Sequence, residues 1–273
     1  MPEEFHLLRR AADKSPVTLT SLREDLGRLG LESGDIVLAH ASLSALGWVA
    51  GGSQTVVLAL LDVLGSQGTL MMPTHSGQLT DPSRWQAPPV PQAWWPIIRA
   101  ESPAFDPDTT PTRSMGAIVE TLRHRPGTIR SGHPYGSFAA LGTESKQLLN
   151  GHAPGCAFGE RSPLARLYDL NGKVLLMGVD HRNNTSLHLA EYRASYAGKA
   201  YHQEGSPILR NGHREWCVYE ELVHDDSDFA VLGEDFRQDT NGEIQATLGW
   251  GTGRLMSQRA VVDYAVEWFE RNR

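Results

Sequence analysis

Apolar runs and helical patterns alternate in the first third of the chain. The runs DIVLAH (residues 35–40) and GTLMMP (68–73) have the length and composition of buried strands. Between them, residues 54–65 (QTVVLALLDVLG) carry apolar side chains at helical spacing, with Ser53 as the candidate N-cap. Because a helix that connects two strands favours parallel pairing, this order predicts an α/β fold.

The same reasoning predicts further elements. The capping box Ser21-Leu-Arg-Glu24 indicates a helix from Ser21 to about Gly30. The run KVLLMGV (173–179) predicts a third strand, which a helix over 185–196 follows with Thr185 as its cap. Two later segments complete the pattern, the alternating strand 215–222 and the amphipathic helix 261–269.

The segment 73–111 has a different composition. It holds nine of the sixteen prolines and the tryptophans Trp85, Trp94 and Trp95. Loops of this length in a compact domain are functional or disordered, and tryptophans argue against disorder, so we expect a packed binding loop or lid. No repeat or linker divides the chain. We therefore expect one α/β domain with a mixed sheet, flanking helices and long inserted loops, in which N-terminal helices (1–34) pack on a core of residues 35–273.

Composition narrows the class of protein. With 40% hydrophobic and 21% charged residues in 273, the chain is typical of a globular protein. Two cysteines, Cys156 and Cys217, exclude a disulfide framework and predict a reducing compartment, hence a cytoplasmic location. The charged N-terminus does not resemble a signal peptide, and no apolar run approaches about 18 residues, so we expect no membrane partner.

The charge is distributed unevenly. The net charge of −7 argues against nucleic acid as a partner. Residues 215–243 contain ten carboxylates and a single Lys or Arg, Arg237, which gives this stretch a charge of −9 and leaves the remainder at about +2. The stretch is either a solvated acidic face or an electrostatic trap for a cationic ligand, and the sequence leaves both open.

Several common motifs are absent. The sequence contains no phosphate loop, no dinucleotide fingerprint, no nucleophile elbow and no HExxH or CxxC spacing. The signature of the widespread GNAT acetyltransferases is also missing. Because the HExxH and CxxC spacings typical of zinc sites are absent, we expect no metal ion.

A histidine and a carboxylate lie at helical spacing just after the third predicted strand. His188 and Glu191 are three residues apart, so they share one face of a helix. A carboxylate that orients an imidazole is the arrangement required of a general base, and Asp180 at the strand end is a second candidate partner. The alternatives are a surface ion pair without a role, or metal ligands.

A second candidate site is the small-residue loop HASLSALGWVAGG (40–52), which connects a strand to a helix N-terminus. Backbone N–H groups of such a loop can hold a carbonyl oxygen or a phosphate. A tight glycine turn without a ligand explains the same composition.

These blocks together resemble a known family. Residues 40–52 with GTLMMPTHSG (68–77), TPTRSMGAIVE (110–120), RPGTIRSGHPYGSFAALG (125–142), GERSPLARLY (159–168) and GVDHRNNTSLHLAEYRA (178–194) are similar to the antibiotic N-acetyltransferase family of aminoglycoside 3-N-acetyltransferases. This family is distinct from the GNAT superfamily. The resemblance covers residues 35 to about 268.

The resemblance implies an α/β acetyltransferase domain, acetyl-CoA as the donor and direct transfer to an amine. His188 matches the family's catalytic histidine, and Glu191 and Asp180 match acidic positions beside it. The SLSALGWV loop and the RSGHP block look like elements that hold coenzyme A. The residues expected at the coenzyme are Ser42, Leu43, Ser44, Gly47, Trp48, Thr74, Arg113, Ser114, Met115, Arg130, Ser131 and His133.

The expected mechanism begins with proton removal, because an aliphatic amine is mostly protonated at neutral pH. We assign this step to His188, with an oxyanion site formed by N–H groups of residues 42–48 together with Ser44 or Thr74. Arg113, Arg130 and His133 are candidates for the coenzyme phosphates. The carboxylates expected to meet a cationic amino sugar are Asp81, Glu101, Glu220 and Asp225.

Other functions use the same residues. A hydrolase or amidase could direct the same His–carboxylate pair at water, a related acetyltransferase could act on another amine, and a binding protein could hold a cation without catalysis. Only the transferases require coenzyme A. The sequence leaves the oligomeric state and the range of antibiotics open.

Overall fold

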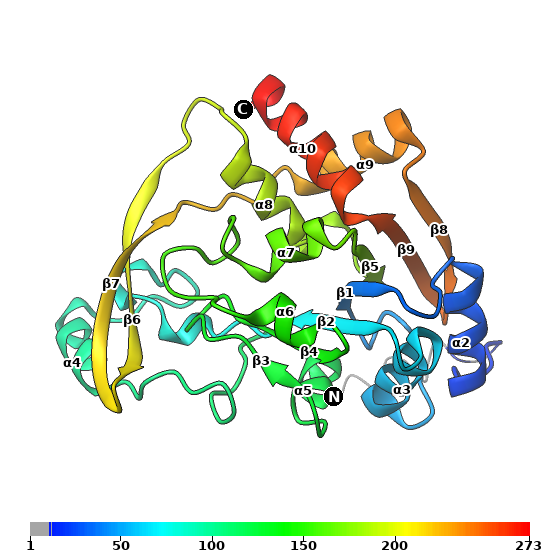
Figure 1. Ribbon diagram of the computed structural model, residues 1–273, viewed down its shortest axis with the longest axis horizontal. Coiled ribbons are helices and arrows are strands. Elements are labelled where there is room, and N and C mark those ends of the chain that lie inside the picture. Colours follow the sequence, from blue (N-terminus) through cyan, green and yellow to red (C-terminus); the bar gives the residue numbers. More distant parts are fainter. Residues whose placement is uncertain (1–10, 12) are drawn as a thin grey trace.

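A seven-stranded mixed sheet forms the centre of the computed structural model, which describes residue 11 and residues 13–273 (Figure 1). The strand order is β3-β4-β2-β1-β5-β9-β8. The bounds are β1 (Ile36–Ala41), β2 (Thr69–Pro73), β3 (Ile129–Arg130), β4 (Phe138–Gly142), β5 (Lys173–Met177), β8 (Glu243–Leu248) and β9 (Gly251–Ser257).

The three central strands are parallel. β1 pairs with β2 on one side and with β5 on the other, while β4 and β9 add antiparallel strands outside them. The predicted α/β fold with a mixed sheet is therefore confirmed. All three parallel strands end at the same edge, where ligand sites of open α/β sheets lie.

Helices cover both faces of the sheet. Side chains alternate along β1, so that Val37 and Ala39 face one hydrophobic core and Leu38 faces the other. One face carries α2 (Leu19–Arg28), α3 (Gly52–Leu64) and α5 (Ala117–Arg123). The other carries α6 (Ser145–Leu149), α7 (Pro163–Asp169), α8 (Ser186–Arg193), α9 (Phe229–Thr240) and α10 (Gln258–Asn272).

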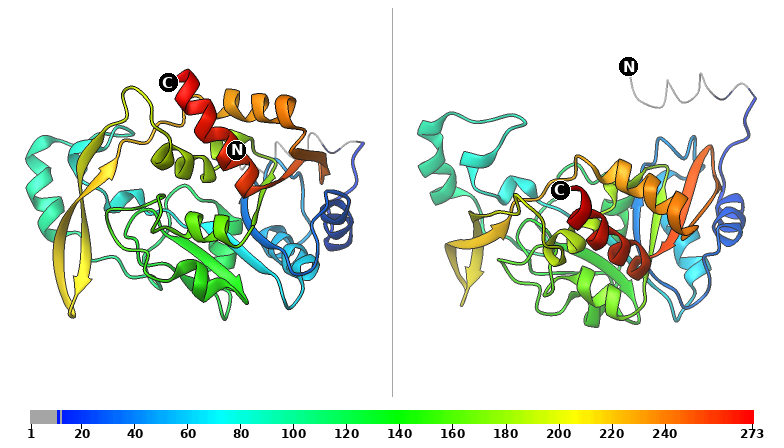
Figure 2. Two further views of the ribbon diagram at one scale, coloured as in Figure 1. Left: turned by 45° about the horizontal axis from the view of Figure 1, so that its top comes forward. Right: turned by 90° about the horizontal axis from the view of Figure 1, so that it is seen from above.

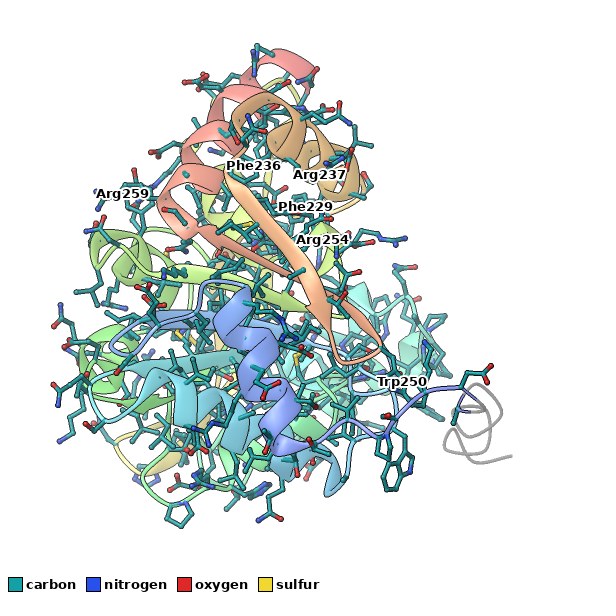
Figure 3. The ribbon with its side chains drawn as sticks, turned by 90° about the vertical axis from the view of Figure 1, so that its right-hand side faces the viewer. Phe229, Phe236, Arg237, Trp250, Arg254 and Arg259 are labelled. Carbon is teal, nitrogen blue, oxygen red and sulfur yellow. The ribbon has the colours of Figure 1, made fainter. Side chains whose placement is uncertain are left out.

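Aromatic packing joins α9 to α10. Phe229 and Phe236 of α9 are fully buried, and Figure 3 shows them where α9 and α10 meet. Their ring centroids lie 6.1 Å from Phe269 and 5.5 Å from Tyr264, both on α10. This contact fixes the C-terminal helix against α9 and the sheet.

A hairpin of β6 (Tyr201–Arg210) and β7 (His213–Leu222) lies with α4 (Trp95–Glu101) at the end of the molecule opposite α2 (Figures 1 and 2). The Arg214 guanidinium donates to the carbonyls of Arg99 and Ser102, and the Phe105 N–H donates to the Pro207 carbonyl. The segment 73–111 is therefore packed, as predicted. Besides α4 it contains the 3₁₀ turns η1 (Gly77–Leu79), η2 (Pro82–Arg84) and η3 (Gln92–Trp94).

Two of the three predicted helix caps are wrong, and the third, Thr185, is right in position but makes no side-chain cap. α2 is capped by Thr18, which forms a capping box with Ser21 rather than Ser21 with Glu24. Gly51 precedes α3, and the Ser53 hydroxyl bonds to Thr121 instead of capping. Thr185 makes no capping bond because the Asn184 side chain takes the N–H of Ser186. In each case a neighbouring side chain or a glycine conformation replaced the predicted cap.

The predicted N-terminal helices fall partly outside the described residues, because residues 1–10 and 12 are not described. Within the described part, α2 packs on α3 and buries Leu22 and Leu26 in the core. None of the helices in residues 13–273 is both long and apolar enough to cross a bilayer.

We predict that Gly47→Ala destabilises the protein by about 2 kcal/mol or more in urea unfolding. Gly47 has φ +91°, and an added Cβ would lie 2.2 Å from the Trp250 ring, so backbone strain and overpacking combine. Trp250 cannot easily retreat, because its indole N–H donates to the Ser15 carbonyl at 2.9 Å. Gly212→Ala is the matched control, since Gly212 has φ +78° but open space around it, and we expect a loss of about 1 kcal/mol. Equal losses would show that the Trp250 contact is unimportant.

Candidate active site

The carboxyl ends of β1, β2 and β5 bring several candidate residues to one edge of the sheet. His40 lies at the end of β1, His75 follows β2, and Gly178 follows β5. The short 3₁₀ turn η4 (His181–Asn183) then leads into α8, which carries His188. Parallel pairing thus joins segments that are far apart in the sequence.

His188 and Glu191 form a close pair on α8, as predicted. The Nδ1 atom of His188 lies 2.5 Å from a carboxylate oxygen of Glu191, and the Glu191 side chain has no exposed surface. The imidazole stacks on Phe158 with 5.1 Å between ring centroids. Among the described contacts, Nε2 of His188 has no protein partner, and the His188 side chain is 15% exposed.

The second oxygen of Glu191 is also bound. It accepts hydrogen bonds from the Arg273 guanidinium at 2.6 Å and from the Asp225 N–H at 3.0 Å. Burial by itself would raise the pKa of Glu191, but the contacts with His188, Arg273 and Asp225 hold it below its ordinary value. Glu191 is therefore ionised at neutral pH.

Three other histidines surround this pair without a charge. Burial, followed by repulsion from His188, lowers the pKa of His40, His75 and His224 to about 3. His224 lies 4.9 Å from His188 between ring centroids. His188 is therefore distinguished from these neighbours by its buried carboxylate partner.

Asp180 does not act as a partner of His188, which corrects one of the two predicted alternatives. Its carboxylate caps η4 through the Arg182 N–H at 3.0 Å and pairs with the Arg182 guanidinium at 2.6 Å. Asp180 is close to His188 in the sequence, but the 3₁₀ turn η4 lies between Asp180 and the start of α8. Asp180 instead lines a neighbouring cavity.

Two adjoining cavities of about 440 and 470 Å³ lie at the strand ends and share Ser42, Val179 and Asn183. We call them together the strand-end groove. The second cavity brings together five of the predicted coenzyme residues, which are Ser42, Leu43, Ser44, Ser114 and Met115. The loop that contains residues 42–44 and the block that contains Ser114 and Met115 are about 70 residues apart in the sequence, and together they form one surface.

The predicted oxyanion loop offers fewer free N–H groups than its length suggests. The N–H of Ser42 donates to Met177, that of Leu46 to Ser42 and that of Gly47 to Ser44. The N–H of Ala45 donates to the Ser42 hydroxyl. Among the described contacts, the N–H groups of Leu43, Ser44 and Trp48 have no protein acceptor, and of these residues Leu43 and Ser44 line the groove. These two are the candidates for binding an oxygen in the groove.

Gly47 and Trp48 do not line the strand-end groove. Gly47 packs against Trp250, and the Trp48 carbonyl accepts from the Val17 N–H. The end of the loop is thus fixed against the segment before α2 and the β8–β9 turn, a structural role that sequence resemblance alone could not separate from binding.

Thr74, Arg130, Ser131 and His133 have internal partners and do not line the strand-end groove, so their predicted contact with coenzyme A stays a prediction. The Arg130 guanidinium donates to the Thr74 carbonyl at 2.6 Å and to other oxygens of neighbouring loops, and burial lowers its pKa to about 10. These further acceptors are Thr74 Oγ1, Ser76, Thr110 and Ser137.

The remaining two side chains are fully enclosed. The Ser131 hydroxyl accepts the Phe138 N–H and bonds to His152, while His133 lies 3.7 Å from the Glu221 carboxylate. Buried polar groups with such partners stabilise loops and are not available to a phosphate. Arg130 and Ser131 also border a separate cavity of about 600 Å³ beside α6.

Arginines near the groove include two that sequence reasoning missed. The predicted Arg113 is exposed and adjoins Ser114 of the second cavity. Arg182 and Arg254 line the first cavity, where Arg182 is mostly exposed and Arg254 donates to the Val179 carbonyl. Figure 3 shows Arg254 on β9. Arg182 stands within the GVDHRNN block, so its position after the strand was the signal available.

The four predicted substrate carboxylates have different surroundings. Asp81 forms a two-point ion pair with Arg99 at 2.8 and 2.9 Å and also caps η2, so its charge is already neutralised. Glu101 on α4 and Glu220 on β7 are exposed. Asp225 is exposed beside the Glu191 contact, and hydrogen bonds from Ser227 lower its pKa.

The acidic stretch 215–243 is spread over β7, α9 and the start of β8 and is not a single patch. Several of its carboxylates have internal partners: Glu215 with Arg210, Glu221 with Tyr192, Asp228 with Arg273, Glu234 with Arg237, Asp235 with Trp268, Asp239 with Tyr264 and Glu243 with His181. Among the four predicted carboxylates, Glu220 and Asp225 are the members of the stretch that stay exposed. Residue 11 and residues 13–273 contain no group of three ligands suited to a metal ion.

Comparisons with known proteins agree with this geometry. YokD, a prophage-derived aminoglycoside N(3′)-acetyltransferase-like protein of Bacillus subtilis (strain 168), is 43% identical over 94% of each chain. Its crystal structure superimposes with a TM-score of 0.92, at 42% identity over 95% of each chain. Aminoglycoside N(3)-acetyltransferase VII of Streptomyces paromomycinus is 38% identical over 98% of this chain and 96% of its own.

Two similar structures contain ligands. AAC-IIIb in a binary complex with CoASH has a TM-score of 0.82, with 31% identity over 94% of this chain and 97% of its own. AAC-VIa bound to sisomicin has a TM-score of 0.83, with 32% identity over 95% and 99%. The family model for aminoglycoside 3-N-acetyltransferase matches residues 38–270. The chain therefore belongs to the aminoglycoside 3-N-acetyltransferase family, as its sequence resemblance predicted.

Proposed function

We propose that the protein transfers the acetyl group of acetyl-CoA to the 3-amino group of an aminoglycoside, with His188 as the general base. The observation that carries this proposal is the close pair of His188 and the fully buried Glu191 at the strand ends. Relatives that bind CoASH and sisomicin support the two substrates.

The first step removes a proton from the substrate ammonium. Glu191 accepts the hydrogen bond from Nδ1–H of His188, which leaves Nε2 as the basic nitrogen. The buried carboxylate then stabilises the imidazolium that forms when Nε2 takes the proton. Such a base contributes about 10²- to 10⁴-fold to the rate.

The second step forms the amide. The free amine attacks the thioester carbonyl, and its carbon–nitrogen bond forms as the carbonyl oxygen gains negative charge. The N–H groups of Leu43 and Ser44 are the candidates that stabilise this oxygen. The intermediate then collapses with cleavage of the carbon–sulfur bond. The former amine nitrogen releases its second proton to solvent to give the neutral amide, and the coenzyme A thiolate takes up the proton held by His188, so that one proton is released per acetyl group transferred.

The strand-end groove fits a long anionic donor. Its floor is formed by the 42–45 loop and Val179, and its borders carry Arg182, Arg254 and the nearby Arg113. Arginine side chains suit phosphate groups because they present several N–H donors in one plane. Arg182 also pairs with Asp180 and Arg254 with Glu243, so a phosphate would share these arginines with a carboxylate. We propose that these three arginines interact with the coenzyme phosphates, because they border the groove and Arg130 does not.

A hydrolase would use the same pair on water. The wide groove with its arginines favours a transferase, since a hydrolase needs no site for a coenzyme. A thiol assay separates the two, because a transferase releases coenzyme A in proportion to added amine.

We predict that acetyl-CoA stabilises the protein against heat. At 100 times its dissociation constant, a ligand that binds the folded state adds about 2.7 kcal/mol. Ala117→Trp should reduce this effect, because Ala117 is exposed at the start of α5 and lines the groove. Val231→Trp, at an exposed position of α9, is the control and should respond like the unaltered protein. A flat response of the unaltered protein to millimolar acetyl-CoA would contradict the donor assignment.

His188→Ala should lower kcat by about 10²-fold or more at neutral pH and leave acetyl-CoA binding nearly unchanged. Glu191→Gln should also lower kcat, because the neutral amide cannot stabilise the imidazolium. His213→Ala is the control, since His213 is exposed at the start of β7. Steady-state kinetics with acetyl-CoA and an aminoglycoside measure the effect, and an active His188→Ala enzyme would rule out this mechanism.

Asp225→Asn should raise KM for a multiply charged aminoglycoside by about two- to fivefold, the effect of an exposed charge pair worth up to about 1 kcal/mol. Added salt should raise KM of the unaltered enzyme in the same direction, because the screening length is about 10 Å at about 0.1 M salt. Glu215→Gln provides the control, since Glu215 already pairs with Arg210 near the hairpin turn. If salt and Asp225→Asn both leave KM unchanged, the stretch is a solvated face.

A further inference from the structure

We infer that Arg273 is a positioning residue for the catalytic pair, holding the Glu191 carboxylate in the orientation that His188 requires. This inference rests on the proposed function of His188. Arg273 lies beyond residue 270, where the match to the family model ends.

The guanidinium of Arg273 bridges two carboxylates. Its Nη1 atom donates to Glu191 at 2.6 Å, and Nε and Nη2 donate to the two oxygens of Asp228 at 2.8 and 2.6 Å. Nη2 also donates to the Asp225 carbonyl at 2.6 Å. A planar guanidinium with partners on both edges has little freedom to turn, so it fixes the plane of the Glu191 carboxylate.

Two aromatic rings also contact the Arg273 guanidinium. Its central carbon lies 3.9 Å from the centroid of Phe269 and 5.2 Å from that of Tyr196. The Arg273 side chain is only 10% exposed, which makes it part of the interior behind the site. α10 thereby contributes to a site whose base stands on α8.

The bridge also supplies the charge balance that Glu191 needs. A buried carboxylate is costly unless it is paired and hydrogen-bonded, and His188 is neutral before it accepts a proton. During that part of the reaction Arg273 is the cation in contact with Glu191. Asp228 in turn neutralises much of Arg273, so the guanidinium does not cancel the attraction of Glu191 for the imidazolium.

Other titratable groups face the pair from every packed element. His40 from β1, His75 after β2 and His224 after β7 are neutral at the pH of the assay, because burial holds the pKa of each at about 3. The charged groups are Asp225 and Asp228 before α9, Glu221 on β7 and Lys199 after α8. Arg273 and Asp228 carry opposite charges in contact, so removing one or the other should change the field at His188 with opposite sign.

Two variants test this sign. Arg273→Gln removes a cation near His188, which favours the imidazolium, so the acid limb of the kcat/KM profile should move to higher pH by about 0.5 unit or more. Asp228→Asn removes an anion and should move the same limb to lower pH. Arg271→Ala, in the last turn of α10, is the control, because Arg271 is exposed and the hydrogen bond described for it runs to the Glu267 carbonyl.

Arg273→Gln should also lower kcat at the plateau of the profile by about tenfold, because Glu191 loses its fixed orientation, whereas KM for acetyl-CoA should stay constant. Arg273→Lys should restore the position of the acid limb but only part of kcat, since an ammonium cannot bridge both carboxylates in one plane.

The outcomes separate this inference from the proposed function. If His188→Ala is inactive while Arg273→Gln and Asp228→Asn both keep the acid limb of the unaltered enzyme, Arg273 serves stability alone and the inference is wrong. If His188→Ala is active, the proposed function fails first. Should Arg273→Gln not fold, Asp228→Asn decides, because a limb unchanged or moved to higher pH in that variant overturns the inference.

Discussion

A fully buried carboxylate at Glu191 is the constraint on which the site depends. An unpaired charge in that position would be prohibitively costly, so the surrounding fold must supply partners for both of its oxygens. One oxygen lies 2.5 Å from Nδ1 of His188, and the other accepts hydrogen bonds from the Arg273 guanidinium and the Asp225 N–H. These donors come from α8, from the residue that follows α10 and from the loop before α9, which explains why three separate segments converge behind one imidazole.

The sheet determines where the strand-end groove lies. Three parallel strands end at one edge, and the loops after them form the strand-end groove, while the antiparallel strands outside them extend the sheet without adding to that edge. The groove borders carry arginines, whereas exposed carboxylates such as Asp225 and Glu220 belong to the segments from the β6–β7 hairpin onward. The arginines and these exposed carboxylates therefore lie on different segments of the chain.

The sequence predicted the α/β class, the parallel central strands and the His188–Glu191 pair, because periodicity and i, i+3 spacing are local properties. It could not separate binding residues from structural ones. Arg130 lies in a sequence block that resembles a coenzyme-binding segment, yet its guanidinium donates hydrogen bonds to the Thr74 carbonyl and the Ser76 hydroxyl. Asp180 is close to His188 in sequence but turns toward Arg182. The Arg273 contact joins residues 82 positions apart, and no local pattern encodes such a distance.

The account's central claim is that His188 takes a proton from the attacking amine. It is tested most directly by comparing the rate deficit of His188→Ala across acceptor amines of decreasing basicity, measured over a range of pH. A deficit of about 10²-fold or more for a fully protonated amine should shrink toward about tenfold or less for a weakly basic amine that arrives already deprotonated. A deficit that stays constant across amine basicity and pH would contradict the account, because His188 would then contribute something other than proton removal.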